Sequence, residues 1–248
     1  MDPLILAHRG SQKIRGFPEN TIPAFQEGLD LGAHGIELDI RMTADRELIV
    51  YHDSDLSRLF GIKQKICQTT LEEIGRLNFT HIFDSKKISI PLLQDVFEKF
   101  GSKLYYNLEI KPSISPYGQL IKRLIQLIDE FKLSEHIWIS SFDAYFLWRW
   151  NKSAPKIPTG YLFEKITHRT KWLFNRSFIK LLHPSILTAE VLEKYDLDKK
   201  VCFWTINLTE QYEQIKSFNP MAIITDDVSI FSDLLIKKNP TKYDDLFD

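Results

Sequence analysis

Residues 35–40 read GIELDI, a short apolar stretch that carries two carboxylates, Glu37 and Asp39. Its length and its isoleucines are typical of a β-strand, in which residues two apart point to the same side. Glu37 and Asp39 therefore share one side of the strand, and Leu38 points to the other. A buried strand holds charged groups only at a cost in free energy. We interpret the stretch as a strand that lines a functional site.

Eight other short apolar runs occur along the chain, and amphipathic segments with apolar residues at helical spacing separate most of them. In chain order, the nine runs are Leu4–His8, Gly35–Ile40, Leu48–His52, Leu104–Ile110, His136–Ser141, Thr159–Phe163, Leu181–His183, Val201–Ile206 and Ala222–Thr225. Strands that alternate with helices over 248 residues predict the α/β class. They favour a (β/α)8 TIM barrel, with an open doubly wound sheet as the alternative.

The run Leu48–His52 does not fit an eight-stranded barrel. Only Arg41–Glu47 separates it from the preceding run, whereas a parallel neighbour needs a crossover of roughly a dozen residues. We therefore predict a hairpin-like excursion there, followed by a small insertion over about residues 54–89, after the second strand. The insertion should contain one short helix that begins at Thr70, with Glu73 completing a capping box. Residues 1–248 are expected to form a single domain.

Capping residues predict where three other helices begin. The first should begin at Asn20 or Thr21, with Pro23 in its first turn. Thr188 and Thr209 are the expected N-caps of two later helices.

The composition excludes several classes of protein. The chain has 44% hydrophobic and 26% charged residues, which is typical of a globular protein, and its net charge of −1 gives no global field that would recruit nucleic acid or an anionic membrane. Its two cysteines, Cys67 and Cys202, exclude a disulfide framework, and Cys202 is expected in the core. No stretch approaches the ~18 apolar residues of a membrane span, and the N-terminal apolar run is too short for a signal peptide. We therefore expect a cytoplasmic protein without a transmembrane segment.

Polar and charged side chains lie at or near the ends of several predicted strands. His8, Asp39, Lys111 and Ser141 occupy such positions, and Glu109 shares a side with Lys111. Catalytic groups of a (β/α)8 barrel gather at the carboxyl ends of its strands. These side chains are therefore expected to line one pocket.

Three carboxylates in this pocket, Glu37, Asp39 and Glu109, indicate a metal site. Carboxylates that converge in a partly dry site repel one another, so either their pKa values rise or a cation joins them. Oxygen ligands suit a hard divalent ion, Mg²⁺ or Ca²⁺. Zinc fits less well, because no histidine pair or cysteine has the spacing of zinc ligands.

Two cations and two histidines complete the predicted pocket. Arg9 and Lys111 beside a metal ion would form a receptor for phosphate. His8 and His52 titrate near neutral pH, which suits proton transfer. Each signal also has a structural reading, such as an ion pair on one face of a strand. Their coincidence at the ends of strands favours a site that hydrolyses a phosphate ester.

The segments AHRG, PENT, ELDIRMTADRELIVYHD and NLEIK, in this order, resemble the glycerophosphodiester phosphodiesterase family. SSFD, FWTIN and IITD agree more weakly, so that the resemblance runs from Leu6 to about Asp226. It implies a (β/α)8 barrel that cleaves glycerophosphodiesters to glycerol 3-phosphate and an alcohol.

The resemblance also assigns roles to individual residues. His8 and His52 match the catalytic histidines, Glu37, Asp39 and Glu109 match the metal ligands, and Arg9 and Lys111 match the residues that hold the phosphate. We expect Trp204 to form an apolar wall of the pocket, with a plain core aromatic as the alternative. Pro18, Glu19 and Asn20 match a Pro-Glu-Asn motif, which we interpret mainly as the cap of the first helix.

Two alternative functions are left open. The same scaffold could act on lysophospholipids in the manner of a phospholipase D, or it could be an inactive binding module, against which the intact set of matched positions argues. The basic and aromatic stretches Tyr145–Trp150 and Thr167–Pro184 could contact a membrane surface. We expect them instead to be barrel helices with their aromatic side chains inward. Water-soluble glycerophosphodiesters are therefore the expected partners, and the oligomeric state is left open.

Overall fold

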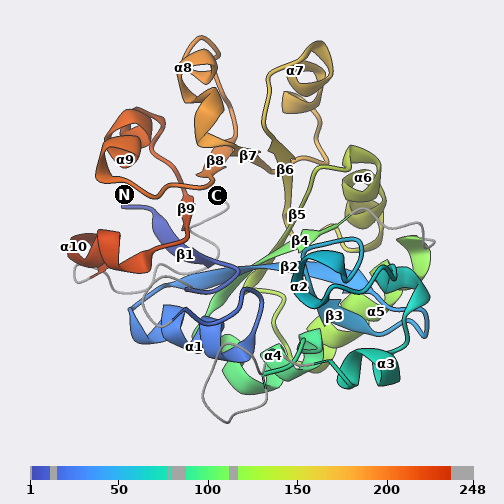
Figure 1. Cartoon of the computed structure of the whole chain (residues 1–248). Coiled ribbons are helices and arrows are strands. Elements are labelled where there is room, and N and C mark those ends of the chain that lie inside the picture. Colours follow the sequence, from blue (N-terminus) through green and yellow to red (C-terminus); the bar gives the residue numbers. More distant parts are fainter. Residues whose placement is uncertain (1, 12–15, 78, 80–87, 112–116, 236–248) are drawn as a thin grey trace.

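The computed structural model describes residues 2–11, 16–77, 79, 88–111 and 117–235. Its centre is a closed barrel of parallel strands that helices surround (Figure 1). The eight barrel strands are β1 (Leu4–His8), β2 (Gly35–Met42), β4 (Tyr105–Ile110), β5 (Ile137–Ser141), β6 (Thr159–Phe163), β7 (Leu181–Pro184), β8 (Lys200–Phe203) and β9 (Ala222–Thr225). β1 pairs with both β2 and β9, and this pairing closes the barrel. The predicted (β/α)8 barrel is therefore confirmed.

Amphipathic helices form the outer layer. They are α1 (Ile22–Asp30), α4 (Leu93–Phe100), α5 (Tyr117–Glu130), α6 (Ala144–Ser153), α7 (His168–Phe174), α8 (Ala189–Leu192), α9 (Thr209–Ile215) and α10 (Ser232–Leu235). Short 3₁₀ segments adjoin several of them: η2 (Gly101–Lys103), η3 (Ile186–Thr188), η4 (Lys216–Phe218) and η5 (Val228–Phe231). On α5, Leu120, Leu124 and Leu127 are buried, so this helix turns one apolar stripe toward the strands. No helix among the residues described is both long enough and apolar enough to cross a membrane.

Alternation along the strands separates two apolar layers. Leu38 of β2 and Ile110 of β4 belong to the buried cluster that also contains helix residues such as Phe97. Leu4 and Cys202 belong to a second cluster that contains no helix residue. Leu38 and Ile110 therefore face the helices, as predicted, and Cys202 lies in the core.

The predicted hairpin-like excursion is also confirmed. β3 (Leu48–Val50) pairs antiparallel with β2, with Met42 opposite Leu48, and it lies at the edge of the sheet outside the barrel. The seven residues Arg41–Glu47 connect the predicted runs, and a connection of this length permits only an antiparallel return.

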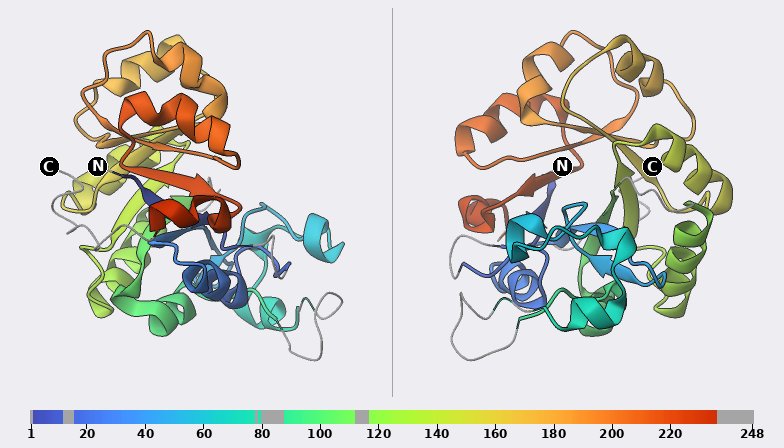
Figure 2. Two further views of the ribbon diagram at one scale, coloured as in Figure 1. Left: turned by 90° about the vertical axis from the view of Figure 1, so that its left-hand side faces the viewer. Right: turned by 45° about the vertical axis from the view of Figure 1, so that its right-hand side comes forward.

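The segment after β3 contains more helix than predicted. Thr70 and Glu73 form the predicted capping box at the start of α3 (Leu71–Gly75), but α2 (Ser57–Phe60) and the 3₁₀ segment η1 (Ile66–Gln68) precede it. These turns are too short to show a periodic apolar pattern in the sequence, which is why we expected one helix. The part around α2 projects away from the barrel (Figure 2). Residues 78 and 80–87 of the predicted insertion lie outside the described residues.

Three of the predicted boundaries need comment. Thr21 is the N-cap of α1, as predicted, although its hydroxyl donates to the carbonyl of Pro18 instead of capping the helix. The prediction for Thr209 was wrong: the N-cap of α9 is Leu208, whose N–H donates to the side chain of Gln211. Thr188 is the N-cap of α8, as predicted, although its hydroxyl donates to the carbonyl of Ser185. The hydroxyls of Thr21 and Thr188 bond to nearby backbone carbonyls and do not accept from the free N–H groups of their helices. At α9, the side chain of Gln211 bonds to the N-cap residue instead.

The inward orientation expected for the aromatic side chains of α6 and α7 was wrong in part. Trp150 and Phe174 are buried, but Tyr145 is 55% exposed and Trp172 is 56% exposed. Helical spacing turns Tyr145 and Trp172 away from the strands that their buried neighbours contact. The predicted run Val201–Ile206 was also too long, because β8 ends at Phe203.

Candidate active site

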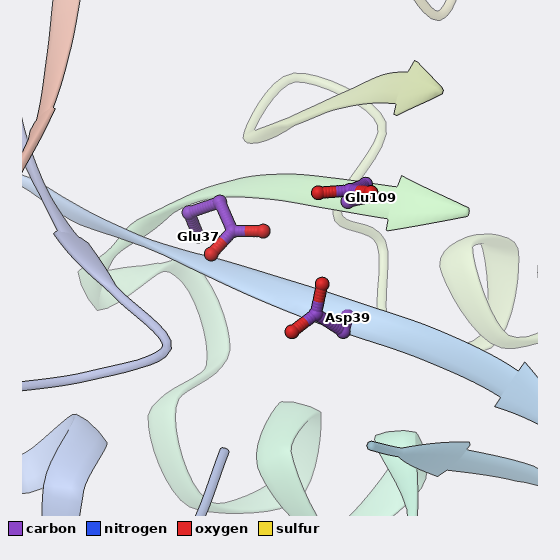
Figure 3. Close-up of side chains that lie close together, drawn as sticks. All are labelled: Glu37, Asp39 and Glu109. Carbon is purple, nitrogen blue, oxygen red and sulfur yellow. The ribbon is translucent and has the colours of Figure 1, made fainter. Parts of the chain in front are cut away.

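Three carboxylates converge inside the mouth of the barrel. Glu37 and Asp39 extend from β2 and Glu109 from β4, and the strands are in a register that pairs Asp39 with Glu109 (Figure 3). One carboxylate oxygen from each of the three lies within 4.8 Å of the other two, and all three side chains are buried. Because residues two apart share a side of a strand, β2 supplies two groups and its neighbour supplies the third.

Burial and mutual repulsion determine the charge of this triad. Burial, together with the charge of Asp39, raises the pKa of Glu37 to about 8. Burial and Asp39 raise the pKa of Glu109 as well. Burial alone would also raise the pKa of Asp39, but Lys111 and Arg9 hold it below its usual range. The triad therefore holds a proton on Glu37 near neutral pH unless a cation is bound.

The triad fits a divalent cation. Oε1 of Glu37 is buried and has no hydrogen-bond partner among the described residues, so one ligand atom is available at the centre of the cluster. Carboxylate oxygens are the ligands that hard divalent ions prefer. The buried triad could therefore bind a metal ion.

Two cations border the triad. Nζ of Lys111 lies 2.9 Å from Oδ1 of Asp39 and also donates to Glu109. Nε of Arg9 lies 3.2 Å from Oδ2 of Asp39, and the backbone N–H of Arg9 donates to the carboxylate of Glu37 at 3.2 Å. Arg9 has a φ of +53°, which is uncommon for a residue with a side chain. This backbone conformation lets the N–H and the guanidinium of one residue reach the same acidic cluster.

The two predicted catalytic histidines have different surroundings. Nε2 of His8 lies 3.8 Å from Glu37, and Nδ1 lies 2.6 Å from a carboxylate oxygen of Asp226. Burial lowers the pKa of His8, but the bond to Asp226 and the charge of Glu37 outweigh it, so the pKa is raised. His52 is less buried, its Nδ1 lies 2.7 Å from Asp53, and burial lowers its pKa.

A pocket of about 420 Å³ opens beside His52 and Lys111. Asp53, Arg58 and Arg41 are among its other lining residues. Nε and Nη2 of Arg41 donate to the backbone carbonyl of His52 at 2.9 and 2.7 Å, so Arg41 fixes the chain that carries this histidine. The pocket is large enough for a small alcohol or phosphate ester next to the acidic triad.

The sequence model of the glycerophosphoryl diester phosphodiesterase family matches residues 8–230 of the chain, which contain all of these side chains. The chain belongs to this family.

Relatives and solved structures agree over almost the whole length. A glycerophosphodiester phosphodiesterase of Caldanaerobacter subterraneus subsp. tengcongensis is 35% identical over 96% of this chain and 99% of its own. The crystal structure of a Thermotoga maritima glycerophosphodiester phosphodiesterase is 27% identical, covers 94% of this chain and 99% of its own, and superposes with a TM-score of 0.74. An Oleispira antarctica phosphodiesterase in complex with the product sn-glycerol-3-phosphate shares the fold at 21% identity, with a TM-score of 0.77 and coverage of 95% and 97%. The chain is accordingly an enzyme, a glycerophosphodiester phosphodiesterase.

In this phosphodiesterase, the Pro-Glu-Asn motif serves the site and not the helix, which corrects our interpretation. The side-chain amide of Asn20 donates to Asp39 at 2.7 Å, and the N–H of Asp39 donates back to Asn20 at 3.2 Å. Glu19 accepts from Nη1 of Arg9 at 3.1 Å. Neither side chain caps α1. The motif resembles a cap in sequence because polar residues precede an apolar pattern in both cases.

Arg58 of α2 connects two parts of the phosphodiesterase site. It donates to Glu19 through Nη2 at 2.5 Å and to Asp53 through Nε at 2.5 Å. Glu19 in turn holds Arg9, and Asp53 holds His52. One guanidinium therefore links the carboxylates that pair with Arg9 and with His52.

Trp204 and Ser141 take structural positions near the mouth. Nε1 of Trp204 donates to the carbonyl of His183 at 2.8 Å, and its ring meets that of Phe142 edge to face at 5.7 Å. Trp204 is half-buried, which leaves part of the ring at the surface. Ser141 does not join the charged cluster, because its hydroxyl donates to the carbonyl of Ile110 at 2.8 Å.

Sequence reasoning missed Asp226, Asn207 and Arg58 of this phosphodiesterase. Asp226 follows directly after the last apolar run and holds His8, while Nδ2 of Asn207 donates to Asp226 at 2.6 Å. The position of Asp226 at the end of a predicted strand was a usable signal, which we did not apply. Arg58 carried no comparable signal, because it lies in a helix of one turn.

Proposed function

We propose that this enzyme hydrolyses glycerophosphodiesters to glycerol 3-phosphate and an alcohol with the help of a divalent cation. The observation that carries the proposal is the buried triad of Glu37, Asp39 and Glu109, bordered by two fixed cations. The product bound to the Oleispira antarctica phosphodiesterase supports the choice of substrate.

We assign the phosphate to Arg9 and Lys111. Their charges lie beside Asp39, where the anionic oxygens of a diester would be bound and held in place. Two fixed cations in a partly dry site also stabilise the charge that develops on phosphorus in the transition state. Trp204 is assigned to the apolar wall of the substrate pocket.

His8 and His52 are assigned to proton transfer. One takes the proton from the attacking hydroxyl, and the other gives a proton to the oxygen of the departing alcohol. Asp226 holds His8, and Asp53 holds His52, so each ring is oriented by a carboxylate at its Nδ1. The nucleophile is water or the 2-hydroxyl of the glycerol, and a cyclic phosphate among the products would identify the second route.

Glu37, Asp39 and Glu109 would hold Mg²⁺ or Ca²⁺. A bound ion of this kind polarises phosphoryl oxygens and supplies positive charge. In its absence, the raised pKa values of Glu37 and Glu109 reduce the charge of the triad.

A panel of phosphate esters tests the proposal. Purified enzyme is assayed with glycerophosphocholine, glycerophosphoethanolamine and a phosphomonoester, before and after chelation and after addition of Mg²⁺ or Ca²⁺. We expect glycerol 3-phosphate from the two diesters only, and only with a divalent ion. Full turnover by protein shown to be metal-free by elemental analysis would refute the metal assignment.

The histidine roles are tested separately. His8→Ala and His52→Ala should each lower kcat by roughly 10²–10⁴, the range usual for a general acid or base. Thermal unfolding of both variants provides the control for folding. Near-normal turnover of a folded variant would remove that histidine from the mechanism.

Lysophospholipids are the second candidate substrates, favoured by apolar side chains at the mouth. Leu187 is 84% exposed after β7, Leu208 is 55% exposed after β8, and Phe142 lies against Trp204 after β5. An acyl chain would cover such side chains, whereas a water-soluble ester would not. The comparison of kcat/KM for lysophosphatidylcholine and glycerophosphocholine decides between them, and we expect glycerophosphocholine to be preferred.

We further propose that residues 1–248 act as one domain, with about residues 54–89 inserted, and that the enzyme works in the cytoplasm on a small molecule. The pairing of β1 with β9 supports one domain, because the first and last strands are neighbours. Cys67 and Cys202 are unpaired, which agrees with a reducing compartment.

A further inference from the structure

Basic residues are concentrated in one part of the chain. Residues 144–189 contain eight Lys or Arg and one acidic residue, Glu164, a net charge of +7. The other residues contain 24 basic and 32 acidic side chains, a net charge of −8, and the two sums give the overall −1. We call the eight cations the basic face: Arg149, Lys152, Lys156, Lys165, Arg169, Lys171, Arg176 and Lys180. They belong to α6, α7 and the flanking segments, and α6 and α7 are consecutive in the outer ring (Figure 1).

The cations of the basic face have no acidic partners within the described part of the chain. No carboxylate described there lies within ion-pair distance of any of the eight, and all eight are exposed or half-exposed. Elsewhere the surface has local pairs, such as Arg76 with Glu72 and Lys216 with Glu213. The basic face therefore presents uncompensated charge, which an anionic surface would complement.

Exposed aromatic rings lie on the same helices or directly before them. Among the described residues, the aromatic side chains that are more than a third exposed are Phe142, Tyr145, Trp148 and Trp172. Tyr145 stacks on Trp148 at 5.8 Å along α6. Tyr and Trp favour the boundary between water and lipid, where one part of the ring is in an apolar environment and the polar atom stays wet.

Each exposed tryptophan is stacked with a cation. Nζ of Lys152 lies 4.1 Å from the ring centre of Trp148, and the guanidinium of Arg176 lies 3.7 Å from that of Trp172. Single-stranded nucleic acid binds through bases that stack on free aromatic faces in a groove. Here a side chain already covers one face of each ring, and the helices are convex. Each pair of a tryptophan and a cation instead combines a ring suited to the boundary between water and lipid with a charge that can reach a lipid phosphate.

We propose that the basic face, with Tyr145, Trp148 and Trp172, docks the enzyme onto membranes that contain anionic phospholipids. Attraction between the cations and the lipid phosphates supplies most of the affinity, and the rings enter the headgroup layer. Docking would keep the enzyme near the bilayer, whose glycerophospholipids yield glycerophosphodiesters when both acyl chains are removed.

Vesicle sedimentation tests the proposal with the whole chain. Vesicles of phosphatidylcholine alone are compared with a three-to-one mixture of phosphatidylcholine and phosphatidylglycerol, at about 0.1 M and about 1 M salt, where the screening length falls from about 10 to about 3 Å. We expect sedimentation with the anionic vesicles at low salt only. Binding of equal strength to phosphatidylcholine alone would contradict the electrostatic mechanism.

Charge reversal with a matched control locates the surface. The variant Lys152→Glu/Arg169→Glu/Lys171→Glu changes the net charge from −1 to −7. Lys63→Glu/Lys99→Glu/Lys103→Glu makes the same change with exposed lysines of other elements. Since each cation near an anionic surface contributes roughly fivefold to binding, the first variant should bind about a hundredfold more weakly. The control should lose far less, and both should keep the thermal stability and kcat of the wild type on a soluble diester.

Two further measurements can overturn the proposal. Trp148→Ala/Trp172→Ala should weaken vesicle binding, and brominated phosphatidylcholine should quench the fluorescence of the wild type more than that of this variant. Equal losses in the two charge-reversal variants would mean that only total charge matters. Tighter binding to a single-stranded oligonucleotide than to the anionic vesicles at the same salt would assign the face to nucleic acid instead.

Discussion

Arg58 lies five residues after Asp53 in the sequence, and its side chain contacts both Asp53 and the distant Glu19. Its side chain is 47% exposed, so its bonds to Glu19 and Asp53 are partly screened by water. The main effect of these bonds is to orient the side chains that Glu19 and Asp53 contact. Glu19 holds Arg9, to which we assign the phosphate, and Asp53 holds the ring of His52.

Arg58→Ala should therefore impair turnover without unfolding the protein. We expect kcat/KM to fall roughly 10- to 100-fold, the range seen when partners that orient catalytic ligands are removed. Because the side chain is accessible, added guanidinium at millimolar concentration should restore part of the activity. Arg76→Ala is the matched control, since Arg76 pairs with Glu72 on α3 and not with a residue of the site. Equal activity of Arg58→Ala and Arg76→Ala would show that the bonds of Arg58 to Glu19 and Asp53 have no role in turnover.

A second residue, His183, should make stability depend on pH. It is fully buried on β7, neither ring nitrogen has a partner among the described residues, and burial lowers its pKa to about 3. Between this value and the unfolded pKa of about 6.5, the unfolded state binds the proton and the folded state does not, so stability falls as pH falls. From pH 7 to pH 5, His183 should reduce the free energy of unfolding by about 2 kcal/mol.

Urea unfolding at both pH values checks this prediction. The decrease in the free energy of unfolding is measured for the wild type and for His183→Gln, which cannot be protonated. The other titrating groups are common to both proteins and cancel in the difference. An equal decrease in both proteins would mean that the ring of His183 is not buried in its neutral form.

At the scale of elements, the packing of β6 against β7 depends on a glycine. A Cβ added to Gly160 would lie 2.4 Å from Nε2 of His183, so the imidazole occupies the space that a side chain on β6 would need. The two strands pair in parallel, with Gly160 opposite Leu181. A close-packed interior has no room to move this ring aside without strain.

Gly160→Ala should lower the free energy of unfolding by about 1–3 kcal/mol, the usual cost of overpacking. In the background of His183→Ala, the same substitution should cost much less, because the ring that it meets is gone. Denaturant unfolding of the four proteins of this cycle measures the coupling. Additive effects of the two substitutions would contradict the contact.

At the scale of the whole molecule, metal binding and folding should be coupled. The three carboxylates belong to β2 and β4, and they are adjacent only when these two strands pair. An ion that binds the folded state alone stabilises it by about 2.7 kcal/mol at a hundred times its dissociation constant. For a chain of this size, 1 kcal/mol raises Tm by roughly 2–4 °C.

We therefore expect Mg²⁺ or Ca²⁺ to raise Tm by roughly 5–10 °C, measured by calorimetry without substrate. Glu37→Gln should lose most of this increase. Without metal, its Tm should be close to that of the wild type, because the pKa of about 8 already keeps Glu37 mostly protonated at pH 7. An equal metal-dependent increase in both proteins would place the ion elsewhere.

Part of this architecture could be predicted because the signals are local. The runs that form β1, β6 and β9 were predicted with the boundaries that the structure has, since apolar stretches of strand length separate clearly from amphipathic helices. Glu37 and Asp39 could be placed on one side of a strand because the side-chain period of a strand is two. One-turn helices such as α2 and the cap of α9 could not be predicted, because too few residues carry a pattern.

The sequence by itself determined the class of fold, the acidic triad and the resemblance to the family, because each depends on residue types at short spacing. Only the tertiary structure decided which distant side chains meet. Asp226 reaches His8 across 218 residues, and Arg58 reaches Glu19 across 39 residues. Closure of the barrel places β1 beside β9, and the segment after β3 places Arg58 of α2 beside Glu19. Such contacts depend on how strands and loops pack in space, and no periodicity along the chain records them.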